Sequence, residues 1–192
     1  MIAIIKYNAG NITSVENAVK RLGYPCVVTD DIDEILRADK VIFPGVGEAK
    51  SAMQYLKDRE LDIVIKSLLQ PVLGICLGLQ LMCNSSEEGD TPCIGIFDAK
   101  VKKFPARDIV PHMGWNNLLR PRTALFSDFS KEDTTYFVHS YYAELSPHTI
   151  AECNYIVPFS AAMQRDNFYA TQFHPEKSGS VGERILHNFL KL

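Results

Sequence analysis

The chain has 192 residues, 46% of them hydrophobic, and its 20 basic and 23 acidic residues give a net charge of −3. This length predicts one domain, residues 1–192, with a substantial apolar core. The balanced charge, without a basic run, disfavours a nucleic-acid partner, and no apolar stretch is long enough to cross a membrane. Five scattered cysteines predict neither a disulfide framework nor a zinc site, so no metal or cofactor is expected and a reducing, cytoplasmic location fits best.

Short β-branched runs alternate with helical patterns in the first half of the chain, which predicts a parallel sheet with helices on its faces. Residues 84–122 contain short strand-like pieces that predict appended antiparallel structure. The predicted fold class is therefore α/β, with a mostly parallel central sheet flanked by helices. The expected strands are 2–5, 26–29, 41–43, 72–75, 135–139, 161–164 and 169–173, and the expected helices are 13–22, 33–37 and 181–190.

The segment Gly74-Ile75-Cys76-Leu77-Gly78 places a cysteine between two glycines where a predicted strand gives way to a helical pattern. It has the form of a nucleophile elbow, in which the nucleophile occupies a sharp, strained turn and the next backbone N–H is free to bind an oxyanion. The carboxyl end of a parallel strand is also where open α/β sheets bind ligands. The alternative is a buried, inert cysteine, which is the commoner fate of a single cysteine with apolar neighbours.

A cysteine nucleophile needs a base that works near neutral pH, and histidine suits this task. His174 is favoured among the five histidines because Glu176 follows it by two residues and could orient its imidazole. In an extended strand, residues two apart point the same way, and Pro175 would stiffen the strand end between them. A solvated His-Pro-Glu turn is the alternative. His139, without a carboxylate at strand spacing, is the second candidate base.

These motifs resemble those of the class I glutamine amidotransferases, and the resemblance extends essentially from end to end. It implies that Cys76, His174 and Glu176 form a triad that releases ammonia from glutamine. It also implies a class I glutamine amidotransferase-like fold and an oxyanion hole made by backbone N–H groups. The oxyanion residues that it implies are Leu77 and either Val46 or Gly47, in the segment Pro44-Gly45-Val46-Gly47, and the substrate-binding residues are Gln80, Glu88, Ser140 and Tyr141.

Two of the substrate assignments have alternatives. Gln80 could be a helix residue that bonds to nearby backbone, and Glu88 could belong to a solvated acidic loop, the commoner fate of such runs.

The segment Pro111-His112-Met113-Gly114-Trp115-Asn116 is more specifically similar to the glutaminase subunits of imidazole glycerol phosphate synthases, a branch of the same family. The resemblance implies a heterodimer with a cyclase subunit that uses the ammonia in histidine biosynthesis. That cyclase is a (β/α)8 barrel of typically about 250 residues, which this chain is too short to include. Core filling is the alternative role for Trp115. The implied interface residues are Asn11, Trp115, Tyr136 and Lys177.

The chain departs from the family pattern at Lys6 and Asn8, where an acidic residue and a glycine are usual, so the interface loop is expected to differ in charge and conformation. Two other functions stay open. A related amidotransferase or γ-glutamyl hydrolase with another acceptor would leave the segment around Trp115 unexplained. A non-catalytic binding scaffold would leave the intact Cys-His-Glu set unexplained.

Overall fold

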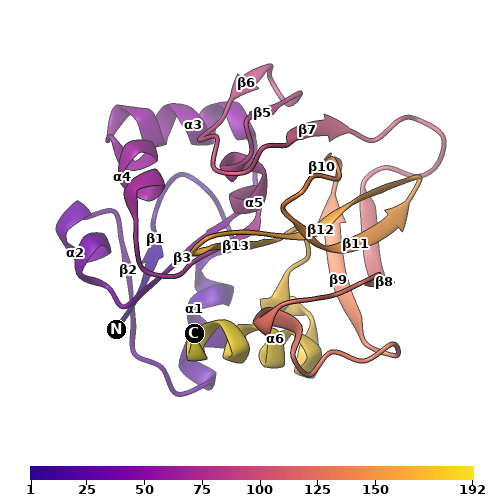
Figure 1. Ribbon diagram of the computed structural model, residues 1–192. Helices are drawn as coiled ribbons and strands as arrows, with labels where there is room; N and C mark the ends of the chain where they lie inside the picture. Colours follow the sequence, from indigo (N-terminus) through magenta and orange to yellow (C-terminus); the bar gives the residue numbers. More distant parts are fainter.

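The structure is a computed structural model that describes residues 1–192. Its centre is a seven-stranded sheet with the order β11-β12-β13-β4-β3-β1-β2 (Figure 1). The five strands from β13 to β2 pair in parallel, and β12 and β11 extend one edge antiparallel. The strands of this sheet are β1 (Ile2–Ile5), β2 (Cys26–Thr29), β3 (Lys40–Gly45), β4 (Val72–Cys76), β11 (Thr149–Tyr155), β12 (Val157–Arg165) and β13 (Phe168–Thr171).

Helices cover both faces of the sheet, because its central strands are apolar on both sides. Alternate residues of β1 contribute to two separate cores: Ala3 and Ile5 to one, Ile2 and Ile4 to the other. Figure 1 shows α3, α4 and α5 on one side of the sheet and α1 and α6 on the other. Residues of the first three helices belong to the first core, and residues of the last two belong to the second. The helices are α1 (Ile12–Arg21), α2 (Ile32–Arg37), α3 (Ala49–Asp58), α4 (Leu61–Ser67), α5 (Leu77–Met82) and α6 (Gly179–Lys191).

Two smaller sheets accompany the central one. A four-stranded sheet has the order β10-β7-β5-β6, and β8 pairs with β9 as an antiparallel ribbon. Short 3₁₀ turns, η1 (Ala124–Phe126) and η2 (Pro175–Lys177), complete the chain. The strands are β5 (Ser85–Ser86), β6 (Thr91–Pro92), β7 (Lys100–Lys103), β8 (His112–Asn117), β9 (Thr134–His139) and β10 (Tyr141–Ala143). A search of the helices for one both long and apolar enough to span a membrane finds none.

The α/β prediction is confirmed, and every predicted strand and helix is present, β1 and β2 with the predicted ends and the others with shifted ends. Four details differ from the predictions. Strand β3 continues through Pro44 to Gly45, and the appended structure is not purely antiparallel, since β5 pairs in parallel with β7. The strand predicted at 169–173 ends at Thr171, and β11 was not predicted. Pairing between distant segments decides these features, and local patterns do not record it.

Candidate active site

Cys76 occupies the turn between β4 and α5, with φ 54° and ψ −105°. A positive φ is costly for a residue with a Cβ, and such strain persists only where the surrounding structure enforces it. Here β4 ends on Cys76 and α5 begins at the next residue, Leu77, so the chain reverses direction without a loop. The sharp, strained turn expected of a nucleophile elbow is therefore present.

The two flanking glycines allow α5 to pack directly on the sheet. A Cβ on Gly78 would lie 1.9 Å from the carbonyl oxygen of Phe43 in β3, and a Cβ on Gly74 would lie 2.6 Å from the sulfur of Met82. Because β3 and β4 pair in parallel with Gly45 opposite Cys76, this close packing holds the end of β3 beside the cysteine. The small residues thus position the elbow against the segment that follows β3.

Tyr7 supports the end of β3 and was not identified from the sequence. Its ring packs against Phe43 with centroids 5.3 Å apart, and its hydroxyl lies 1.8 Å from the position that a Cβ on Gly45 would take. The hydroxyl is buried and has no hydrogen-bond partner. Burial, and secondly the nearby Cys76, hold the pKa of this phenol well above its ordinary value. Because the Tyr7 hydroxyl occupies the space that a Cβ would need, position 45 requires a glycine.

His174 and Glu176 form a buried pair. Nδ1 of His174 lies 2.7 Å from Oε1 of Glu176, and the two side chains are 1% and 0% exposed. They do not project from an extended strand end, as the sequence predicted, because Pro175 to Lys177 form the 3₁₀ turn η2. Proline favours this outcome, since its fixed φ suits the first position of a helical turn. The Ser178 hydroxyl fastens the turn by donating to the His174 carbonyl oxygen at 2.7 Å.

Asn11 reaches the same pair from the loop before α1. It has a left-handed backbone, with φ 70°, and its side-chain amide donates a hydrogen bond to Oε1 of Glu176. The sequence assigned Asn11 to a partner interface, and the structure places its amide on the carboxylate that orients His174. Glu176 is therefore held from two sides, by an imidazole and by an amide.

The electrostatic surroundings of His174 favour its protonated form. Burial alone would lower its pKa, but the negative charges of Cys76 and Glu176 outweigh burial and raise the pKa to about 10. The outer nitrogen, Nε2, is buried and has no hydrogen-bond partner, and Cys76 is the largest of the influences that raise the pKa of His174. The site can thus hold a proton next to the cysteine.

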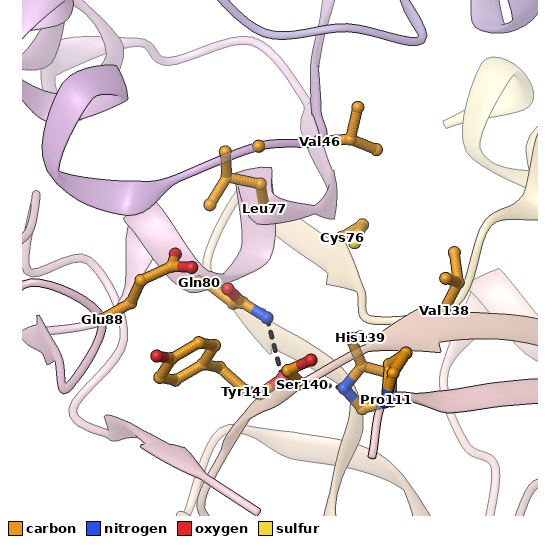
Figure 2. Close-up of a pocket in the computed structure, with 11 residues that line it drawn as sticks. Val46, Cys76, Leu77, Gln80, Glu88, Pro111, Val138, His139, Ser140 and Tyr141 are labelled. Atoms are coloured by element: carbon orange, nitrogen blue, oxygen red, sulfur yellow. Dashed lines mark hydrogen bonds between the residues drawn. The ribbon is translucent and has the colours of Figure 1, made fainter.

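A cavity of about 250 Å³ opens beside Cys76 (Figure 2). It brings together every residue that the sequence assigned to the oxyanion hole and to substrate binding. Figure 2 shows Glu88, Gln80 and Tyr141 toward one end and Cys76 with Val46 toward the other. The cavity is lined by Val46, Gly47, Cys76, Leu77, Gln80, Glu88, Pro111, Val138, His139, Ser140 and Tyr141.

The polar groups of the cavity have defined partners. The Gln80 amide nitrogen donates to the Tyr141 carbonyl oxygen at 2.9 Å and to Oε1 of Gln172 at 3.0 Å, so only its own oxygen is free for a ligand. One Glu88 oxygen accepts a hydrogen bond from the Ala49 N–H at the start of α3. Burial raises the pKa of Glu88, and that hydrogen bond opposes the rise. Glu88 is therefore a half-buried wall of the cavity and not part of a solvated loop.

Gln172 is a polar contact of the cysteine and was missed from the sequence. It is fully buried, and its amide nitrogen donates to the Cys76 sulfur at 3.6 Å. The sequence could have indicated this residue, because a glutamine at the end of an apolar strand must find hydrogen-bond partners when it is buried.

His139, the second candidate base, has both ring nitrogens engaged: Nδ1 with the Tyr141 carbonyl oxygen at 2.8 Å and Nε2 with Nδ1 of His112 at 2.9 Å. Neither nitrogen is free to accept a proton from the cysteine.

The residues predicted at a partner interface, apart from Asn11, lie on or next to the β8–β9 ribbon. Trp115 and Tyr136 are paired across it, with ring centroids 5.8 Å apart. Trp115 is 56% exposed, so it does not fill a core, and Met113 on the same strand is 63% exposed. Lys177 is also exposed, in η2, where the preceding His174 N–H donates to the Tyr136 carbonyl oxygen at 2.9 Å.

Comparison with known proteins gives consistent matches over the whole chain. The family model described as "Glutamine amidotransferase class-I" matches residues 3–192. The imidazole glycerol phosphate synthase subunit HisH of Bacteroides fragilis is 59% identical over 194 residues, covering 100% of this chain and 99% of the relative. The Pasteurella multocida protein of the same name is 49% identical over 192 residues, covering 99% and 97%.

Solved structures show the same fold at low sequence identity. A structure described as a GMP synthase protein from Thermoplasma acidophilum superposes with a TM-score of 0.75 at 21% identity, covering 100% of this chain and 92% of that one. A structure described as a glutamine amidotransferase gives a TM-score of 0.77 at 16% identity, with 100% and 98% coverage. At these identities the likeness concerns the fold alone.

Proposed function

The chain belongs to the class I glutamine amidotransferases and, within them, to the HisH subunits of imidazole glycerol phosphate synthase, and we propose that it hydrolyses glutamine through Cys76. The ammonia passes to a partner subunit, and the synthase is an enzyme of histidine biosynthesis. One observation carries this proposal. Cys76, on a strained elbow at the wall of a cavity, interacts electrostatically with a buried His174–Glu176 pair. We assign residues 1–192 to a single domain that acts in the cytoplasm, a location that five unpaired cysteines fit.

The reaction begins with attack of the Cys76 sulfur on the carboxamide carbon of glutamine. A carbon–sulfur bond forms, and the carbonyl electron pair moves onto oxygen, where backbone N–H groups of Leu77 and of Val46 or Gly47 stabilise it. The preorganised elbow supports this role for Leu77, because the first N–H groups of a helix have no partner within the helix. Gly47 has φ 121°, and no atom lies within 4 Å of where its Cβ would be. The space beside this part of the oxyanion segment is therefore open.

His174 then transfers its proton to the departing nitrogen, and the carbon–nitrogen bond breaks to give ammonia and a γ-glutamyl thioester. Water replaces ammonia, gives a proton to His174 and attacks the thioester, which releases glutamate and restores the thiolate–imidazolium pair. Glu176 keeps the imidazole in one orientation and stabilises its charged form. The raised pKa of His174, about 10, supports its role as the proton donor.

The far end of the cavity has the groups that an amino acid needs. The free oxygens of Glu88 and Gln80 can accept hydrogen bonds from the α-ammonium group of glutamine. Ser140 and Tyr141 line the adjacent wall and would contact the substrate through their backbone groups. Glutamine would therefore extend from Glu88 toward Cys76, with its carboxamide at the elbow.

We assign the partner to the exposed face of the β8–β9 ribbon, with Trp115, Tyr136 and Lys177 as contacts and Asn11 nearby. Exposed Trp115 and Met113 support this, since large aromatic and thioether side chains are enriched at interfaces. The partner would be a cyclase with a (β/α)8 barrel in a heterodimer, and the lyase chemistry would take place there. Direct transfer has a chemical reason, because ammonia in neutral water becomes ammonium and loses its nucleophilic electron pair.

We further propose that glutamine hydrolysis is slow until the partner and its ligand bind, with residues 44–47 as the switch. Glycine at 45 and 47 makes a peptide rearrangement there sterically cheap. Glutamate release by the isolated chain and by the complex with partner and ligand measures this effect. Equal rates would contradict it.

The decisive test of the whole proposal is glutamate release by point variants in the complex with a cyclase partner. Cys76→Ala and His174→Ala should abolish turnover, and Glu176→Gln should retain a small fraction. Cys93→Ala is the matched control, because this half-buried thiol lies outside the cavity and should not matter. Turnover by Cys76→Ala at the wild-type rate would overturn the proposal.

A further inference from the structure

Two sets of hydrogen bonds meet at the backbone carbonyl oxygen of Tyr141. His139 approaches it through Nδ1 at 2.8 Å, and Gln80 approaches it through its amide nitrogen at 2.9 Å. A carbonyl oxygen can only accept hydrogen bonds, so both side chains must present an N–H to it. This one oxygen therefore fixes the direction of every hydrogen bond that continues from either side chain.

The outward set leads to the β8–β9 ribbon. His139 is neutral, because burial lowers its pKa to about 3, so with a proton on Nδ1 its Nε2 must accept. His112 therefore donates from Nδ1 at 2.9 Å, which leaves its own Nε2 to accept from the Asn116 amide at 3.4 Å. Asn116 is half-buried and directly follows the exposed Trp115 in β8.

The inward set leads to the cysteine. The Gln80 amide nitrogen also donates to Oε1 of Gln172 at 3.0 Å, so the Gln172 amide must turn its nitrogen the other way. That nitrogen donates to the Cys76 sulfur at 3.6 Å. Gln172 is fully buried and is absent from the cavity wall, so it can act on the sulfur but not on a bound substrate.

We propose that Gln172 is a positioning residue that holds the Cys76 sulfur, and that a hydrogen-bond chain whose two arms converge on the Tyr141 carbonyl oxygen connects it to Asn116 on the ribbon. The proposal rests on the role of Cys76 as the nucleophile. An N–H donor favours the charged form of the group that accepts it, so Gln172 promotes the thiolate. The chain runs Asn116, His112, His139, Tyr141 carbonyl, Gln80, Gln172, Cys76.

The chain gives the outer face of the ribbon a physical connection to the reacting atom. The intermediate side chains, His112, His139, Gln80 and Gln172, are buried and each makes two of these hydrogen bonds, so displacement of one member leaves an unpaired polar group in the interior. A protein that docks on Trp115 and shifts Asn116 would therefore change the hydrogen bond at the sulfur. A double-mutant cycle measures whether coupling follows this network.

The first experiment follows alkylation of Cys76 by iodoacetamide against pH in the full chain, with Gln172→Met and Gln172→Glu. The Met variant removes the donor, and the Glu variant keeps the shape but places an acceptor at the sulfur. The pH midpoint of alkylation should rise by about one to two units in the Met variant, the effect of a donor on a charged group, and further in the Glu variant. The KM for glutamine should stay within about twofold while kcat falls about tenfold or more.

A merely structural role of Gln172 predicts a different order. The Glu variant is closer in shape, so it would resemble the wild type more than the Met variant does, and that result would overturn the proposal. The other thiols react more slowly, because burial raises the pKa of Cys26, Cys83, Cys93 and Cys153, and protection by glutamine identifies the label on Cys76.

The second experiment tests the distant end with His112→Phe. A phenyl ring can keep the stacking of His112 on Phe137 and Tyr155, at centroid distances of 4.8 and 4.1 Å, while the donor to His139 is lost. The alkylation midpoint should rise by about half a unit in the wild-type background and not at all in the Gln172→Met background. Equal shifts in both backgrounds, or no shift in either, would refute the coupling.

Asn117→Ala is the control for the second experiment, since Asn117 follows Asn116 on the same ribbon but bonds only to the backbone of 131 and 133 and, through its own N–H, to the Asn116 side chain. It should leave the midpoint unchanged.

Failure of the proposed function has a separate signature, namely turnover by Cys76→Ala. If that variant is inactive, Cys76 is labelled and both Gln172 variants keep the wild-type midpoint, only the positioning role fails.

Discussion

Gly78→Ala is the most informative single substitution in the elbow, because it adds one methyl group at the contact between α5 and β3. The new Cβ would lie 1.9 Å from the Phe43 carbonyl oxygen and 3.1 Å from the carbonyl carbon. Such atoms do not approach closer than 3.0 Å in proteins, so α5 must retreat from β3 by about 1.1 Å. The obstacle is backbone, so rotation of a side chain cannot relieve it.

The expected losses in activity and in stability differ in size. A retreat of this size moves the N–H of Leu77 away from the segment after β3, and a 1 Å misplacement of reacting groups costs about 10²-fold in rate. Overpacking costs about 1–3 kcal/mol, while alanine in place of glycine within a helix returns about 1 kcal/mol. The net loss of about 0–2 kcal/mol corresponds to a fall in Tm of at most about 8 °C for a chain of this length.

The assay pairs glutamate release with thermal unfolding. We expect kcat/KM to fall about a hundredfold in a variant that remains folded at 25 °C, with the decrease mainly in kcat. Ser180→Ala, an exposed substitution in α6, is the control for alanine in a helix and should change neither quantity. Wild-type kcat/KM together with a raised Tm would show that the site does not need close packing of α5 on β3. That result would refute the explanation of the elbow glycines.

Three further predictions concern buried polar groups. Burial lowers the pKa of His112 to about 4 and of His139 to about 3, so near pH 5 these residues bind protons when unfolded but not when folded. Stability should therefore decline as the pH falls from about 6.5 toward 4, measured by urea unfolding, and His112→Phe should make that decline shallower. Tyr7→Phe removes a buried hydroxyl that has no hydrogen-bond partner, so it should raise the free energy of unfolding by about 1 kcal/mol. A decrease would indicate that the hydroxyl does form a hydrogen bond. Asn11→Ala removes a donor to Glu176 and should lower kcat about tenfold with KM unchanged, whereas a pure interface role would affect only the complex.

Local sequence patterns were sufficient for the parallel sheet and for the elbow. The β-branched runs and helical spacings correctly indicated β1 to β4 and α1, because each element is specified by its own burial pattern. The turn at Cys76 was also predictable, since small residues on both sides of a strand-to-helix junction have a direct steric cause in the 1.9 Å approach to β3.

Features that depend on distant partners were not predictable in the same way. The sequence His174-Pro175-Glu176 is compatible with a strand end or a 3₁₀ turn, and the bond from His174 to the Tyr136 carbonyl accompanies the turn. Gln172 contacts a cysteine 96 residues away, and His112 pairs with a histidine 27 residues away. The periodicity of apolar residues indicates which face of an element is buried, but not which polar group pairs with a buried polar side chain.

The β8–β9 ribbon contacts both halves of the candidate site, and this determines what a docked partner can affect. Cys76 belongs to the parallel sheet, whereas His174 directly precedes η2, whose position depends on β9 through the Tyr136 N–H bond to Ser178 and the His174 N–H bond to Tyr136. The hydrogen-bond chain from Asn116 connects the same ribbon to Cys76 by a second route. A partner bound on Trp115 would therefore act on His174 and on Cys76 at once, and variants of Tyr136 and of Gln172 should alter activation by that partner independently.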